Sequence, residues 1–232
     1  MEHLVERLPF LTTAIAIAMV VEMFRHYRTR RSQYLKWWII GVITYGFGTL
    51  TESIHVVLGW HIVNLKVWYV AGALLGGFPL AQGSVYLLMS KPIGDWSARI
   101  CIAFVLIATS FIVLTPISLD ATFDGDLTGK VFTWQWVRLF SPFINIYAVI
   151  FLVGGAIYSA GRYFRAGSKE APFKGNILIA IGGILPGIGG SMARAGYTEI
   201  LYVTELFGLI LIYCGYKLIK EYNIRVRLQS TT

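Results

Sequence analysis

The chain has 232 residues, of which 56% are hydrophobic and only 14% are charged, and its mean hydropathy is +0.65. This composition is too apolar for an ordinary soluble domain and predicts a polytopic helical membrane protein. The formal net charge of +8 is spread over short loops. That distribution favours anionic membrane lipids as partners at the cytoplasmic face and argues against nucleic acid.

Apolar stretches of membrane length recur along the chain. A helix needs about 20 mostly apolar residues to cross the hydrocarbon core, whereas a barrel strand needs roughly ten. Because backbone polar groups in lipid must pair internally, these long stretches are expected to be helices. We therefore predict an all-α fold and a single transmembrane domain over residues 1–232, with seven helices at about 9–25, 37–59, 67–90, 100–119, 139–161, 176–196 and 199–218.

Most of the 20 lysines and arginines fall in alternate connections, namely those near residues 25–36, 91–99 and 162–174, and in the C-terminal segment 217–227. The other side carries only Arg7, Lys66, Lys130, Arg138 and Arg194. The positive-inside rule then predicts an outside N-terminus and a cytoplasmic C-terminus, as in a multi-pass protein of a bacterial inner membrane. All seven tryptophans lie near a predicted helix end, where an interfacial belt would place them.

Two segments with similar glycine spacing predict an internal repeat. Aligning "GVITYGFGTLTES" with "GGILPGIGGSMAR" pairs Gly41, Gly46 and Gly48 with Gly182, Gly187 and Gly189, and Ser53 with Arg194. "FRHYR" after the first helix likewise resembles "GRYFR" after the fifth. These matches favour two parallel three-helix units joined by the fourth helix, a 3+1+3 arrangement.

Three segments carry a resemblance to a known class of membrane module: "YLKWWIIGVITYGFGTLTES", "KVWYVAGALLGGFPLAQGSVYLL" and "GNILIAIGGILPGIGGSMARAGYTEILYVTELFGLILI". They resemble the seven-helix modules at the N-termini of bacterial histidine kinases, and the uncharacterised stand-alone relatives of those modules. The resemblance implies a sensor-like bundle. No phosphoacceptor, ATP-binding or coiled-coil segment follows residue 220 in this sequence, so the output would pass to a protein partner.

Glycine and proline interrupt two of the predicted helices. Gly187 and Gly189 in the sixth helix are expected to allow close packing against another helix. Pro79 in the third helix and Pro186 in the sixth are expected to weaken the backbone hydrogen-bond ladder. Irregular membrane backbone is tolerated only where protein or a polar cavity receives the freed carbonyl groups, so these prolines are candidates to flank a cavity.

Ionisable residues inside the membrane are costly and are therefore functional candidates. Glu22 has a local explanation, because Arg25 follows three residues later and can pair with it near the headgroups. Glu52 has no adjacent cation, His55 follows it on the same helix face, and Glu205 is at a similar outer depth.

Arg194, at the outer end of its helix, is expected to form a bridge with Glu205. The group of Glu52, His55, Arg194 and Glu205 is then either a structural ion network or a polar pocket that opens outward, with Asn145 and Gln82 as further candidates for its wall.

The sequence contains no recognisable catalytic set, and we expect no catalytic residue, no metal and no cofactor. The leading hypothesis is an integral membrane sensor or signal-relay module with ligand-binding residues in the outer half and output through a protein partner or a homo-oligomer. Two alternatives stay open: a small-solute transporter of the parallel-repeat type, and a non-catalytic accessory subunit of a membrane complex.

Overall fold

The computed structural model describes residues 5–119, 125–167 and 170–229. Within these ranges the chain is a bundle of helices, and its β-structure is one isolated bridge between Ile117 and Phe132. The elements in chain order are α2 (Leu8–Arg30), α3 (Gln33–Leu58), α4 (Ile62–Trp68), the π-helix η1 (Tyr69–Leu74), α5 (Phe78–Leu88), α6 (Lys91–Leu114), the 3-10 helices η2 (Gly129–Val131) and η3 (Gln135–Leu139), α7 (Phe140–Ala148), the π-helix η4 (Val149–Val153), α8 (Gly154–Arg165), α9 (Ala171–Arg194) and α10 (Thr198–Gln229).

Six helical stretches of the described chain are long and apolar enough to cross a membrane, so the all-α prediction is confirmed and a multi-pass membrane protein is supported. The six are α2, the composite Ile62–Leu88, α6, the composite Gln135–Arg165, α9 and α10. Each composite contains a π-helical turn.

The helix α3 is as long as the others but is not among the six, so a seventh span stays a prediction. Its apolar run is diluted by Lys36, Glu52 and several hydroxyl residues. Many of its residues are buried, from Leu35 to Ser53, because α2, α4 and α5 pack around it. A helix shielded by its neighbours needs less apolar surface than one that faces lipid.

Several predicted helix ends were wrong. The fourth helix was expected at 100–119, but α6 begins at Lys91 and ends at Leu114. Pro92 fits its first turn, where a missing N–H costs nothing, and Thr115 is extended because Pro116 follows it. The last helix was expected to end at 218, but α10 continues to Gln229 as a charged extension of the apolar run.

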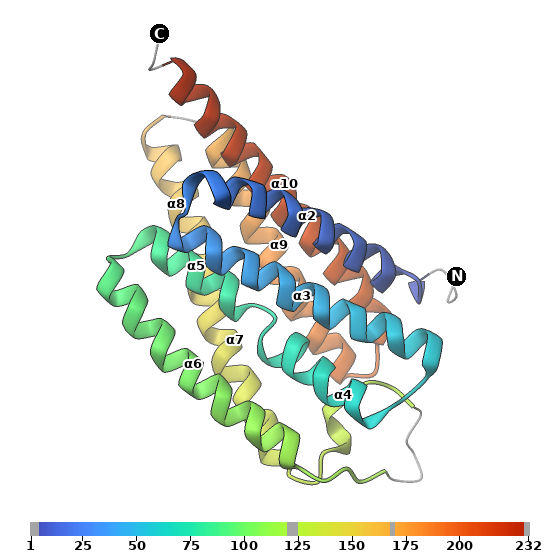
Figure 1. Cartoon of the computed structure of the whole chain (residues 1–232). Coiled ribbons are helices and arrows are strands. Elements are labelled where there is room, and N and C mark those ends of the chain that lie inside the picture. Colours follow the sequence, from blue (N-terminus) through green and yellow to red (C-terminus); the bar gives the residue numbers. More distant parts are fainter. Residues whose placement is uncertain (1–4, 120–124, 168–169, 230–232) are drawn as a thin grey trace.

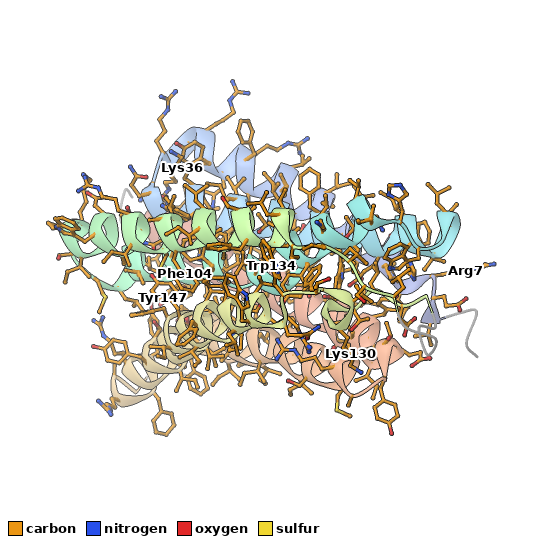
Figure 2. All side chains as sticks on the ribbon, turned by 90° about the horizontal axis from the view of Figure 1, so that it is seen from below. Arg7, Lys36, Phe104, Lys130, Trp134 and Tyr147 are labelled. Atoms are coloured by element: carbon orange, nitrogen blue, oxygen red, sulfur yellow. The ribbon has the colours of Figure 1, made fainter. Side chains whose placement is uncertain are left out.

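The helices run up and down, so the connections alternate between the two ends of the bundle. Figure 1 shows the α2–α3, α5–α6 and α8–α9 connections at the end from which the C-terminus emerges, and the N-terminus at the other. Lys36 and Arg7 lie towards these opposite ends (Figure 2). Here "inner end" denotes the end with the C-terminus, and "outer end" the other.

The outer surface of the bundle is rich in large apolar side chains. Leu106 on α6 is 62% exposed and Phe143 on α7 is 67% exposed. Such apolar exposure around a whole bundle is expected where lipid, rather than water, covers the helices.

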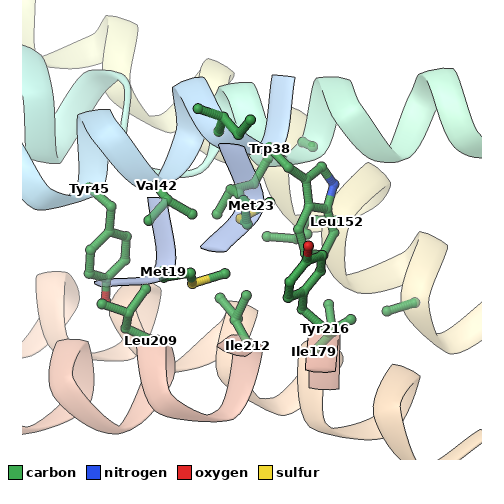
Figure 3. Packing of buried hydrophobic residues seen from close by; sticks show 14 of the residues in the cluster. Met19, Met23, Trp38, Val42, Tyr45, Leu152, Ile179, Leu209, Ile212 and Tyr216 are labelled. Atoms are coloured by element: carbon green, nitrogen blue, oxygen red, sulfur yellow. The ribbon is translucent and has the colours of Figure 1, made fainter. Parts of the chain in front are cut away.

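The interior contains two apolar clusters. The larger one joins α2, α3, α9 and α10, with Met19, Val42, Leu209 and Ile212 in contact across the bundle (Figure 3). The second lies under the connection between α6 and α7 and includes Phe132, which is fully buried. This connection therefore packs over the outer end of the bundle.

Glycines seven residues apart allow α9 and α10 to pack closely. Gly182 faces the backbone of α10, and a Cβ atom added to it would lie 2.6 Å from the carbonyl oxygen of Gly208. Gly175 and Gly215 face each other in the same way one heptad further inward. Close packing of small residues is the main attraction between helices in lipid, so this contact fixes the two helices together.

Candidate functional site

Two buried carboxyl groups meet between α3 and α10 in the outer half of the bundle. Glu52 lies in the last two turns of α3 and is 1% exposed, whereas Glu205 lies two turns into α10 and its Oε2 atom is buried. The two side chains are neighbours across this part of the bundle. We call Glu52, Glu205 and their neighbours Tyr45, His55 and Trp68 the carboxyl cluster.

A glycine contact positions Trp68 against Glu52. A Cβ atom added to Gly48 would lie 3.3 Å from the Cα atom of Gly72, so α3 and η1 approach backbone to backbone. Trp68 precedes Gly72 by about one turn and Glu52 follows Gly48 by about one turn, so the antiparallel segments bring the two side chains together. The indole Nε1 of Trp68 donates a hydrogen bond of 3.0 Å to Oε1 of Glu52.

A second hydrogen bond ties α3 to α10. The hydroxyl of Tyr45 donates to the backbone carbonyl of Glu205 over 2.7 Å. The tyrosine points from α3 towards α10 beside Leu209 (Figure 3). Tyr202 is also buried, and it lies near both carboxyl groups.

The pairing of the two carboxyl groups has a chemical requirement. An ionised carboxylate can only accept hydrogen bonds, so two carboxyl groups bond to each other only when one holds a proton. Oε2 of Glu52, Oε2 of Glu205 and Nδ1 of His55 are buried and have no hydrogen-bond partner among the described residues. Among all the described residues, no lysine or arginine lies within ion-pairing distance of either carboxyl group. The arrangement is therefore suited to hold and release a proton.

The expected bridge between Arg194 and Glu205 is absent from the described structure. Arg194 is exposed and lies in the last turn of α9. Gly189 faces α10, and five residues further along a helix the direction has turned by about 140°. Arg194 therefore points away from α10. The prediction of the bridge used only the depth of Arg194 in the membrane, and depth does not show which face of a helix a residue lies on.

Gln82 and Asn145 do not join the carboxyl cluster. Gln82 is fully buried nearer the inner end, where its Nε2 donates to the carbonyl of Gly94 over 2.9 Å and its Oε1 accepts from Tyr147 over 2.7 Å. Asn145 on α7 donates to the carbonyl of Ala73 in η1 over 3.4 Å. Both amides therefore complete backbone or hydroxyl hydrogen bonds between helices.

The two prolines have different effects on their helices. The third predicted helix is interrupted at residues 75–77, and Pro79 fits the first turn of the new helix α5. Pro186 lies inside α9 without ending it, and its ring carbons would lie 3.1 and 3.2 Å from a Cβ atom on Gly208.

Only one of the two neighbouring glycines in α9 makes the expected contact. Gly189 is buried, and a Cβ atom on it would lie 2.9 Å from the Cα atom of Leu201. Gly187 is exposed with open space beside it, so the expectation that it packs against a helix was wrong.

Glu22 was also assigned the wrong partner. It accepts a hydrogen bond from Tyr213, and its Oε1 pairs with Nζ of Lys220 over 2.8 Å, so it links α2 to α10 rather than pairing with Arg25. The prediction considered only pairs three or four residues apart on one helix, so it could not find a partner on another helix. The role of Trp68 was missed for a related reason, since its position near a helix end is also typical of a lipid-facing belt.

Two connected cavities lie at the inner end of the bundle, away from the carboxyl cluster. The deeper one measures about 610 Å³, counting its open mouth, and is lined by residues of α2, α3, α5, α8, α9 and α10. The described residues contain no group of three His, Cys, Asp or Glu side chains that could hold a metal ion.

Comparison of the chain with family models, with curated proteins and with solved structures found no match.

Proposed function

We propose that this chain is an integral membrane sensor or signal-relay module whose input site is the carboxyl cluster and whose output element is α10. The observation that carries the proposal is the proximity of Glu52 on α3 and Glu205 on α10, whose Oε2 atoms are both buried without a hydrogen-bond partner or a paired cation among the described residues. Loss of their shared proton would place two negative charges side by side in a buried site, which favours separation of the two helices.

The helix α10 is suited to carry such a change to the inner end. It runs without a break from Thr198 to Gln229, which corresponds to about 48 Å at 1.5 Å per residue. Its inner part contacts α2 through the ion pair between Lys220 and Glu22. A shift at Glu205 would therefore move a charged inner segment that a partner protein or a second copy of the chain can bind.

The proposal includes seven spans, with α3 as the seventh, and a cytoplasmic inner end. The basic connections between α2 and α3, between α5 and α6 and between α8 and α9 share that end with the charged part of α10. This agrees with the positive-inside rule, and the proposed location is a bacterial inner membrane.

Equivalent glycine contacts support the 3+1+3 repeat within this proposal. Gly41 faces Leu80 on α5 and Gly48 faces η1, so the second helix packs on the third. The aligned residues Gly182 and Gly189 face α10, so the sixth helix packs on the seventh. The carboxyl cluster then joins one helix from each repeat.

Spin labels can test the input mechanism. Labels at the exposed positions Val57 on α3 and Tyr197 before α10 report the distance between the outer ends of these helices. We expect this distance to increase when the pH is raised and to stay at its low-pH value in Glu52→Gln, because glutamine pairs with Glu205 without a titrating proton. An identical distance distribution at both pH values in the unsubstituted chain would contradict the proposal.

A solute carrier is the second candidate, and the inner cavity between the two three-helix units favours it. Solute uptake by proteoliposomes that is lost in Glu52→Gln would support the carrier. Ligand or proton binding without flux would support the sensor. Copurification at fixed stoichiometry with other subunits, and no response of the isolated chain, would support an accessory subunit.

A further inference from the structure

The inner end of the bundle contains an amphipathic cleft, formed by the two connected cavities. The deeper part is bounded by apolar side chains from four helices: Trp38 on α3, Leu87 and Leu88 on α5, Ile179 on α9 and Ile219 on α10. Leu87 is 55% exposed, so this wall reaches the lipid-facing surface of the bundle. An apolar wall that reaches this surface is suited to receive a hydrocarbon chain from the membrane.

The mouth of the cleft is polar and basic. Arg30, Lys220 and Arg227 line it together with His26, Tyr34 and Asn223. Four of these residues also line the deeper part, so the two cavities are continuous. The lining of neither cavity includes an aspartate or a glutamate, and Glu22, which pairs with Lys220, lies outside both linings.

The side chains around the mouth are held in place by hydrogen bonds. Nδ1 of His26 lies 2.8 Å from the hydroxyl of Tyr216, and Lys220 is paired with Glu22 over 2.8 Å. The Nζ atom of Lys220 also lies 5.9 Å from the centre of the Tyr216 ring. Trp38, which is 7% exposed, contributes to the wall of the deeper part.

We propose that this cleft binds one anionic phospholipid, with its phosphate group at Arg30 and Lys220 and an acyl chain along Trp38, Leu88 and Ile179. The charge of the mouth selects a phosphate, and the apolar depth distinguishes a lipid from free phosphate or a soluble phosphate ester. Because the wall includes α3 and α5 on one side and α8, α9 and α10 on the other, the bound lipid stabilises the contact between the two halves.

The test uses the full chain in a neutral detergent, with lipid binding measured by native mass spectrometry and by the shift in melting temperature. We expect one phosphatidylglycerol to bind and raise the melting temperature, and phosphatidylcholine to bind about tenfold more weakly, because its choline group meets the basic mouth. Inorganic phosphate at millimolar concentration should neither raise the melting temperature nor displace the lipid. Displacement by inorganic phosphate would overturn the lipid assignment and leave a phosphate site.

A matched pair of arginines on α2 distinguishes lipid binding in the cleft from general attraction of anionic lipids to basic surfaces. Arg30 lines the mouth, whereas Arg28 is exposed two residues away and does not line either cavity. We expect Arg30→Gln to weaken phosphatidylglycerol binding about tenfold or more and Arg28→Gln to leave it unchanged. Equal effects of the two substitutions would overturn the proposal.

Ser159→Phe places a large side chain in the cleft from α8 and should abolish binding of one lipid. Should this variant fail to fold, the arginine pair still decides the question. The lipid site does not depend on the sensor proposal. Loss of specific lipid binding would leave the pH response of the carboxyl cluster intact, and loss of that pH response would leave lipid binding intact.

Discussion

At the scale of single residues, the account depends on hydrogen bonds to buried polar atoms. Trp68 donates to Glu52, and Tyr45 donates to the carbonyl of Glu205. Removing a donor from a buried acceptor costs about 1–3 kcal/mol, because the acceptor has no water to replace it. Trp68 therefore holds the carboxyl group of Glu52 in place, and Tyr45 holds the backbone of α10 at Glu205.

Trp68→Phe keeps an aromatic ring but removes the indole N–H group together with the five-membered ring that carries it. We expect it to lower the free energy of unfolding by about 1–3 kcal/mol. Thermal melting of the purified protein measures the change, and Trp96→Phe is the control because Trp96 is 63% exposed. Equal melting temperatures for the two variants would show that the bond to Glu52 contributes nothing.

Substituting the carboxyl groups one at a time has a different expected outcome. In Glu52→Gln or Glu205→Gln the new amide can donate to the remaining carboxylate, so the contact survives without a shared proton. We expect each variant to retain its stability within about 1 kcal/mol. Strong destabilisation by both substitutions, measured by thermal melting, would indicate an ionised structural network rather than a proton site.

At the scale of helices, the contact between α9 and α10 offers a matched pair of glycines. Gly189→Leu would push its side chain into the backbone of Leu201, and overpacking of this kind costs about 1–3 kcal/mol or prevents folding. Gly187→Leu faces open space and should be tolerated. The melting temperatures of the two variants distinguish these outcomes, and a stable Gly189→Leu with an unstable Gly187→Leu would reverse the assigned helix face.

The helices were largely predictable from the sequence, because membrane-length apolar runs leave few alternatives. The ends of the helices were less predictable, because Pro92 and Pro116 determine where α6 begins and ends more strongly than hydropathy does. Side-chain partners were the least predictable. Arg194 and Glu205 have similar outer depths, yet they lie on helix faces that do not meet, and helix rotation is set by packing at Gly182 and Gly189.

At the scale of the whole molecule, orientation is the first property to test. Lys130→Cys lies on the outer connection and Ala166→Cys on the inner one, and both positions are exposed. In a chain with Cys101→Ala and Cys214→Ala, we expect a membrane-impermeant maleimide added to intact cells to label the first cysteine only. Labelling of the cysteine at position 166 alone would show that the orientation is the reverse of the one proposed. Labelling of both cysteines would contradict the alternation of the connections between the two sides of the membrane.

The central claim is that Glu52 and Glu205 share one proton between α3 and α10. Infrared difference spectroscopy of the protein in lipid, recorded between low and high pH, measures it directly. We predict a band of a buried protonated carboxyl group that disappears as the pH rises and that shifts in frequency in both Glu52→Gln and Glu205→Gln, because the remaining carboxyl group has lost its carboxyl partner. A band that is unchanged in both variants, or the absence of such a band from the unsubstituted protein at every pH, would contradict the account.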